Sequence, residues 1–315
     1  MKPFLSLFML IMAVGSLAGS LSRLADDNLP PPYMNRPAPP ASAEAAKQME
    51  RQIAEARAAY KANPNDADAI IWLGRRLAYP GRFKEAIQVF SEGIRKFPDD
   101  ARFYRHRGHR YITLRRFDLA RKDFESAAAL IKGKSDEVEP DGQPNARNIP
   151  TSTLQFNIWY HLGLTYYLTA EYKKALASYR ECLKVSKNPD ALVATTHWLY
   201  MTLRRLNRTS ESNLLLNSID SGLAIIENDG YYQLLLMYKG LVTEKWLLEH
   251  VLKQPAGAAS HSVMYGIGNW YLYDGRRDEA MAIFKRILST DQWTSFGFIA
   301  AEADMNRLRS KARTI

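Results

Sequence analysis

Residues 67–100 read ADAIIWLGRRLAYPGRFKEAIQVFSEGIRKFPDD, and residues 101–134 read ARFYRHRGHRYITLRRFDLARKDFESAAALIKGK. When the two stretches are aligned, small and aromatic residues return at the same positions, 34 residues apart. The matched pairs are Pro64 and Pro98, Gly74 and Gly108, Ala86 and Ala120, and Phe90 and Phe124. A return at this period is typical of paired helices stacked in a row, so we expect an all-α chain.

The residue types at these positions explain why two helices form and pack. Small residues at Gly74 and Ala86 allow the two helices of a pair to approach closely, and Phe90 fills the space between this pair and the next. Pro98 cannot continue a helix, so it fixes the turn into the following unit. The repeat therefore predicts both the helices and the way in which they stack.

The same pattern recurs further along the chain. A third unit follows an insertion of 21 residues and contains Gly163, and the last clear unit contains Gly268. A shifted unit between them carries Tyr200 in place of the glycine, and one degenerate unit is expected around residues 231–252. Four units thus follow the pattern well, one is shifted and one is degenerate.

These small and aromatic positions resemble the tetratricopeptide repeat (TPR) family over residues 42–308. The resemblance implies a right-handed α-solenoid of helix hairpins, with an inserted loop at residues 132–151. We expect a capping helix at each end, over residues 42–62 and 293–308, the second covering the last open face. The family binds and assembles partners of many kinds, and the whole segment also resembles exported bacterial members.

The N-terminal sequence predicts export. Lys2 precedes an apolar run from Phe4 to Leu17, which is short for a membrane span and fits a signal peptide over residues 1–20. Residues 21–41 are rich in proline and predict a stiff, extended spacer. We therefore expect a periplasmic or secreted protein. The alternative is a chain anchored by an uncleaved N-terminal segment.

The charge balance favours an anionic partner. The formal net charge is +10, and residues 101–122 hold eight Arg or Lys and one Asp. Such a balance suits acidic peptides, acidic glycans or lipid head groups, while export argues against nucleic acid. The only cysteine, Cys182, excludes an intramolecular disulfide and is expected to be a small buried hydrophobe.

A stack of helix pairs curves around a concave surface, which the first helix of each pair lines in TPR-like proteins. Arginine there can pair a carboxylate through two hydrogen bonds, and tyrosine and tryptophan offer flat surfaces. The residues predicted to bind a partner are Arg75, Arg102, Arg105, His109, Tyr160, Tyr167 and Trp198. For the Arg-rich stretch, the alternative is a solvated outer face.

These residues predict a non-catalytic scaffold that holds an acidic or extended protein segment. A second hypothesis is an accessory protein that stacks glycans, anionic ones included, on the groove aromatics. A third is an unrecognised hydrolase, which needs two carboxylates facing each other in a cleft. The inserted loop, residues 132–151, either folds back through Glu137, Glu139 and Asp141 to occupy the groove, or is unstructured at a repeat boundary.

The motifs of common enzymes are absent from the sequence. It contains no Gly-rich phosphate loop, nucleophile elbow or HExxH motif. His106 and His109 can share a helix face, but no Cys or carboxylate cluster stands at a suitable spacing to complete a metal site. The Asn and Lys positions of the basic clamp by which some TPR proteins bind a C-terminal carboxylate are not reproduced either. We therefore predict no enzyme activity, cofactor or metal.

Overall fold

The computed structural model describes residues 33, 36, 38, 42–254 and 257–312. The predicted signal peptide and most of the predicted spacer lie outside these residues. The part of the chain that the structure describes folds into fourteen α-helices without a strand, so the predicted all-α solenoid is confirmed. None of these helices combines the length and hydropathy that a bilayer crossing requires.

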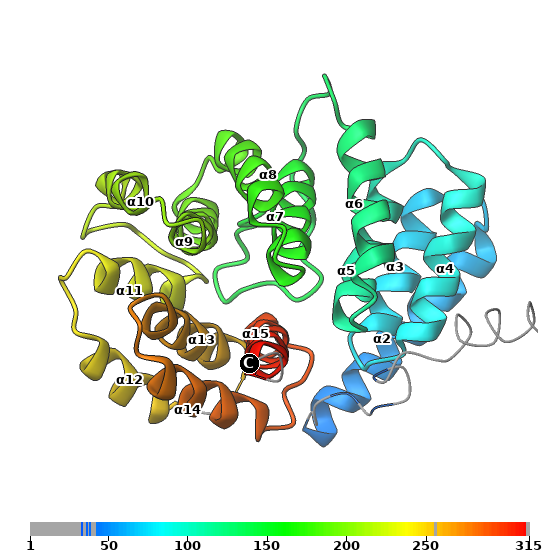
Figure 1. Ribbon diagram of the computed structural model, residues 1–315. Coiled ribbons are helices and arrows are strands. Elements are labelled where there is room, and N and C mark those ends of the chain that lie inside the picture. Colours follow the sequence, from blue (N-terminus) through cyan, green and yellow to red (C-terminus); the bar gives the residue numbers. More distant parts are fainter. Residues whose placement is uncertain (1–32, 34–35, 37, 39–41, 255–256, 313–315) are drawn as a thin grey trace, which may run out of the picture.

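The helices follow one another as hairpins arranged around a curve (Figure 1). They are α2 (Ala43–Ala62), α3 (Ala67–Ala78), α4 (Phe83–Lys96), α5 (Ala101–Thr113), α6 (Phe117–Leu130), α7 (Leu154–Leu168), α8 (Tyr172–Val185), α9 (Pro189–Arg205), α10 (Thr209–Leu215) with the 3-10 helix η1 (Leu216–Ser218), α11 (Asp229–Tyr238), α12 (Glu244–Leu252), α13 (Ala258–Tyr273), α14 (Arg277–Leu288) and α15 (Phe296–Ala312). The shifted and degenerate units fold as the hairpins α9–α10 and α11–α12.

In four hairpins a glycine of the first helix lies against an aromatic ring of the second. A Cβ atom added at Gly74 would lie 2.4 Å from the ring of Phe90, and one at Gly163 would lie 2.7 Å from the ring of Tyr179. Both distances are too short for any side chain, so the predicted role of the glycine is confirmed. The other two pairs are Gly108 with Phe124 and Gly268 with Phe284.

The insertion between α6 and α7 is held at several points. Val138 and Thr153 form an isolated antiparallel bridge, and the amide of Leu154 donates to the carbonyl of Glu137 (2.9 Å). Farther along, the side-chain amide of Asn145 donates to Glu227 at the start of the α11 hairpin (3.0 Å). The segment is therefore not the unstructured loop of the alternative expectation, because it makes hydrogen bonds to the start of α7 and to the residues before α11.

Helix α15 lies inside the curve of the hairpins (Figure 1), where it packs against α13 and α14 and reaches α7. Its buried Asp304 accepts hydrogen bonds from Arg205 of α9 (2.6 Å), Tyr265 of α13 (2.9 Å) and Arg307 (2.6 Å). Arg307 also donates to the carbonyl of Leu168 (2.7 Å). The predicted terminal helix exists, but it fills the concave side as well as covering the last hairpin.

The chain end also meets the second hairpin, so the solenoid closes on itself. Arg115, in the turn between α5 and α6, donates to Glu302 (2.7 Å) and to the carbonyl of Trp293 (2.9 Å). The Trp293 ring stacks on Tyr33 at 5.2 Å between centroids, and the Tyr33 hydroxyl donates to Glu302. We call these four residues, Tyr33, Arg115, Trp293 and Glu302, the closure seam.

Candidate functional site

Helix α5 carries the cationic side chains of the candidate site. Gly108 faces Phe124 of α6, which leaves the neighbouring positions of α5 for the concave side. Four of them line a cavity of about 140 Å³ between α3, α5 and the insertion, which we call the arginine pocket. Its lining residues are Arg75, Ala78, Tyr79, Phe90, Arg105, His106, His109, Arg110 and Glu139.

A carboxylate of the insertion occupies one wall of the arginine pocket. Glu139 is only 8% exposed, and its carboxylate lies 2.9 Å from Nε of Arg105 and 3.9 Å from Nε2 of His106. The side-chain amide of Asn157 in α7 donates to the same carboxylate (3.2 Å). Of the acidic residues proposed to fold back on the Arg-rich unit, Glu139 makes this contact.

The main chain of the insertion is bound as well. Arg75 donates to the carbonyl of Pro140 (2.7 Å), and Arg76 donates to the carbonyl of Gly142 (2.8 Å). A Cβ atom at Gly142 would lie 1.4 Å from the hydroxyl of Tyr79, so a larger residue there requires Tyr79 or the segment to shift. Side chains of α3 and α5 thus hold the carboxylate and two backbone carbonyls of residues 139–142, in the way that a groove holds an extended peptide.

Three guanidinium groups share the pocket with this one carboxylate. Burial, strengthened by the charges of Arg105 and Arg110, lowers the pKa of His106 and His109, so both rings are neutral at pH 7. Burial and the charges of Arg105 and Arg75 lower the pKa of Arg110 to about 10. The pocket therefore carries an excess of positive charge.

The predicted site residues fall into three groups. Arg75, Arg105 and His109 come together in the arginine pocket. Arg102 stands apart, because it donates to Asp100 (2.7 Å) and to Asp68 (2.6 Å), and hydrogen bonding to Asp100 raises its pKa. Its charge is balanced within the chain, so it contributes less to an excess charge than the sequence suggested.

The predicted aromatic lining is buried. Tyr160, Tyr167 and Trp198 are 6%, 0% and 1% exposed. The Tyr160 hydroxyl lies 3.2 Å from that of Tyr231 in α11, and the Tyr167 hydroxyl lies 3.0 Å from that of Tyr265 in α13. The expectation that these three rings face an open groove is wrong, because helices of the later hairpins curve round and cover them.

Two arginines of the site were missing from the sequence-based prediction. Arg110 follows His106 by four positions, which puts both on one helix face, and this spacing was the available signal. Arg76 lies beside Arg75, but its contact with Gly142 depends on how the insertion folds. No local pattern could reveal that contact.

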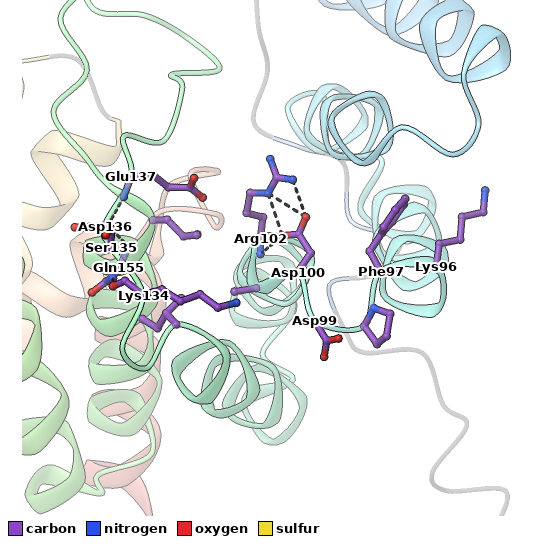
Figure 2. A pocket seen from close by; sticks show the side chains of 14 residues that line it. Lys96, Phe97, Asp99, Asp100, Arg102, Lys134, Ser135, Asp136, Glu137 and Gln155 are labelled. Atoms are coloured by element: carbon purple, nitrogen blue, oxygen red, sulfur yellow. Dashed lines mark hydrogen bonds and ion pairs between the residues drawn. The ribbon is translucent and has the colours of Figure 1, made fainter.

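A wider cavity, of about 640 Å³, lies where the α4–α5 turn meets the start of the insertion (Figure 2). Its charges are mixed and largely satisfied internally. In the figure, Arg102 is paired with Asp100, and the Asp136 carboxylate accepts from the amide of Gln155 (3.0 Å). This cavity selects no single class of ligand. Its lining residues are Lys96, Phe97, Pro98, Asp99, Asp100, Ala101, Arg102, Ile131, Lys134, Ser135, Asp136, Glu137, Leu154 and Gln155.

The described residues contain no group of three or more His, Cys, Asp or Glu side chains placed to hold a metal ion. Cys182 is buried, and its Sγ lies 3.1 Å from the hydroxyl of Thr195. Burial raises the pKa of this thiol to about 12, so it behaves as the small buried residue that the sequence predicted.

The sequence model of the tetratricopeptide repeat matches residues 156–189 and residues 263–296. These ranges correspond to the hairpins α7–α8 and α13–α14. No curated protein matches the chain. A stack of such hairpins around a concave side defines a helical repeat scaffold. The chain is a tetratricopeptide repeat protein, a class whose fold suggests binding of a protein or peptide and which is generally non-catalytic.

Solved structures with a similar chain path include YrrB, described as a TPR protein with an unusual peptide-binding site. It is 14% identical, with a TM-score of 0.43, over 79% of this chain and 97% of that one. A crystal structure of MamA is 15% identical, with a TM-score of 0.42, over 63% of this chain and 92% of that one. These superpositions are loose, so nothing about the ligand of this chain follows from them.

Proposed function

We propose that this protein is a non-catalytic scaffold that binds an extended acidic segment of a protein partner in the arginine pocket. One observation carries the proposal: the concave side already holds an acidic piece of the protein's own chain through the Glu139 carboxylate and two backbone carbonyls. Arginine suits this task because its planar group donates several hydrogen bonds to carboxylate and carbonyl oxygens. A partner segment would take the place of residues 139–142.

The two other hypotheses find less support in the geometry. A sugar ring would have to stack on Tyr160 or Trp198, and both are covered. A hydrolase would need two carboxylates facing each other. Among the described residues that line the arginine pocket, Glu139 is the only acidic one. An acidic protein segment therefore remains the ligand that the pocket fits best.

We also propose that the scaffold works outside the cytoplasm, in the periplasm or as a secreted protein. The apolar run from Phe4 to Leu17 and the small residues after it support this location. Fractionation of cells, with mass spectrometry of the mature N-terminus, tests it. Loss of about 20 residues is expected, whereas an intact N-terminus in the membrane fraction favours the anchored alternative.

A peptide-binding experiment tests the proposed function. A labelled peptide with the sequence SDEVEPDGQ, residues 135–143, is titrated against the full chain and followed by fluorescence polarisation. In the wild type, residues 139–142 of the chain compete with the peptide for the arginine pocket at a high effective concentration, so the peptide binds weakly. We expect G142A to bind at least about tenfold more tightly, because its new methyl group collides with Tyr79 and displaces the segment.

Two controls accompany this experiment. G222A adds a methyl group in open space and is expected to bind like the wild type. Replacing the four acidic residues of the peptide by Asn or Gln removes the groups that arginine recognises, and R105Q combined with G142A removes the arginine. If G142A gains no affinity, or if R105Q leaves the gain intact, the proposed function is wrong.

A further inference from the structure

None of the described residues gives Arg110 an anionic partner in the arginine pocket. Its guanidinium group lines the cavity, and the contact recorded for it is with the ring of Phe83, at 5.8 Å. Among the described residues, no carboxylate lies within ion-pair distance of it. Arg105, by contrast, is matched by Glu139, and Arg102 by Asp100 and Asp68.

An unmatched cation in such a place is costly. Removing a guanidinium group from water is unfavourable unless an anion or several acceptors replace the lost hydration. Here the cost is increased because Arg105 and Arg75 act on Arg110 with the same charge. Arg110 is thus a half-buried positive charge that no carboxylate among the described residues balances.

We propose that Arg110 is a second carboxylate site, and that the partner of this scaffold is an extended segment with two acidic side chains separated by one residue. The proposal rests on the proposed function and adds the spacing of the ligand's charges. The cavity of about 140 Å³ beside Glu139 has room for one further carboxylate.

The spacing follows from the geometry of helix and strand. Arg105 and Arg110 are five positions apart on α5, which corresponds to a rise of about 7.5 Å and a rotation of about 140°, and both side chains reach the same cavity. In an extended chain, residues i and i+2 point to the same side and lie about 6.6 Å apart. A Glu-x-Glu segment whose first carboxylate takes the Glu139 place, and whose chain then runs along α5 instead of α3, thus brings its second carboxylate towards Arg110.

The insertion itself has this spacing but does not use it. Asp141 stands two residues after Glu139, yet it is not part of the pocket lining. The carbonyls of Pro140 and Gly142 are held by Arg75 and Arg76, which fixes the chain on either side of Asp141 along α3. The internal segment therefore occupies one of two sites, and a ligand that fills both can displace it.

The experiment compares nine-residue peptides on the full-length G142A protein by fluorescence polarisation. Their glutamates stand at positions 4 and 6, at position 4 alone, or at positions 4 and 5, in an otherwise Ala/Ser/Gly background. We expect the peptide with positions 4 and 6 to bind about tenfold more tightly than the other two, since it alone adds a charge-assisted hydrogen bond at Arg110.

Substitutions then assign the gain to Arg110. R110Q is expected to remove the preference, so that the diacidic and the single-glutamate peptides bind R110Q equally, while R95Q, at an exposed position, keeps the preference. R110K serves as a second variant that keeps the charge, and thermal melts verify that each variant folds. A preference that survives R110Q, or equal binding of the two diacidic peptides, overturns the inference and leaves the proposed function standing.

Two further outcomes complete the test. If no acidic peptide binds G142A, both the proposed function and the inference are overturned. If inorganic phosphate at matched ionic strength displaces the single-glutamate and the diacidic peptides equally, the pocket binds any free anion and does not recognise the spacing of two carboxylates. The inference is then again overturned.

Discussion

His197 is a fully buried histidine in the middle of α9, away from the arginine pocket. Its ring stacks on Tyr231 at 4.8 Å, and its Nδ1 lies 3.4 Å from the hydroxyl of Tyr238. Nε2 has no hydrogen-bond partner among the described atoms. Burial alone lowers the pKa of this imidazole to about 3, so the folded protein holds it neutral.

A pH dependence of stability follows from this residue. Below pH 6.5 the unfolded chain takes up a proton at His197 and the folded protein does not, so stability is lost as the pH falls. At pH 5 the loss amounts to about 2 kcal/mol from this group. Urea unfolding at pH 7.5 and pH 5.0 measures it: H197F should lose about 2 kcal/mol less than the wild type on acidification.

The exposed His250 provides the control, because H250Q should keep the pH dependence of the wild type. Other buried histidines, such as His161 with a pKa of about 3, add their own losses, so the difference between variants is the quantity to compare. An H197F protein that loses as much stability as the wild type would show that His197 is not held neutral.

At single residues, the sequence predicts local requirements and misses distant partners. The need for a small residue at Gly74 comes from a helix pair that is nearby in the chain, so the repeat reveals it. The neutralisation of Arg102 depends on Asp100, two positions away, and on Asp68, which lies 34 positions away in another hairpin. The composition of residues 101–122 therefore gives the number of charges correctly. It does not show that Arg102 is paired with carboxylates while Arg110 is not.

Among the elements, α15 depends on one buried carboxylate. Asp304 is 1% exposed and accepts hydrogen bonds from α9, α13 and its own helix. Arg205, its partner from α9, is itself largely buried. A helix anchored in this way is held by a charge pair that has little access to water.

Removing that carboxylate should loosen α15. D304A leaves Arg205 buried without its counter-ion, and we expect a loss of about 3–5 kcal/mol in the free energy of unfolding. Urea denaturation measures the loss. D278A, at an exposed position of α14, is the matched control and should change stability by less than about 0.5 kcal/mol. A D304A protein as stable as the control would show that this network does not hold α15.

Element positions were only partly predictable. The sequence predicts a terminal helix over residues 293–308, and α15 covers most of that range. Its place inside the curve depends on Arg205, Tyr265 and the carbonyl of Leu168, which belong to three other helices. Likewise, the sequence of the insertion offers the fold-back of Glu137, Glu139 and Asp141 as one of two alternatives, but it does not show that Glu139 is the one that reaches Arg105.

At the scale of the whole molecule, the closure seam joins the last helix to the second hairpin. The Arg115 and Glu302 side chains are 10% and 21% exposed, so their ion pair is shielded from solvent. The Arg115 guanidinium also lies 3.9 Å above the ring of Tyr33. An open stack of repeats has no such contact, because each repeat there meets only its neighbours.

A double-mutant cycle tests the seam. R115E and E302R each place two like charges in a shielded site, and each should cost about 3 kcal/mol of stability. The double variant restores an opposite pair in reversed order and should recover at least about half of the summed loss. Urea unfolding measures all four proteins, with R95E as an exposed control. Strictly additive losses would show that Arg115 and Glu302 do not stabilise each other.

The closure seam also bears on how the chain reaches its native state. Its hydrogen bonds join residues 187 and 269 positions apart, whereas the hairpins are built from local contacts. Long-range contacts slow folding, since the loop between them must be ordered first. During synthesis the early hairpins are complete well before residue 302 is made. The hairpins that form the arginine pocket can therefore fold before α15 is synthesised. The contacts of the closure seam form only after α15 has been made.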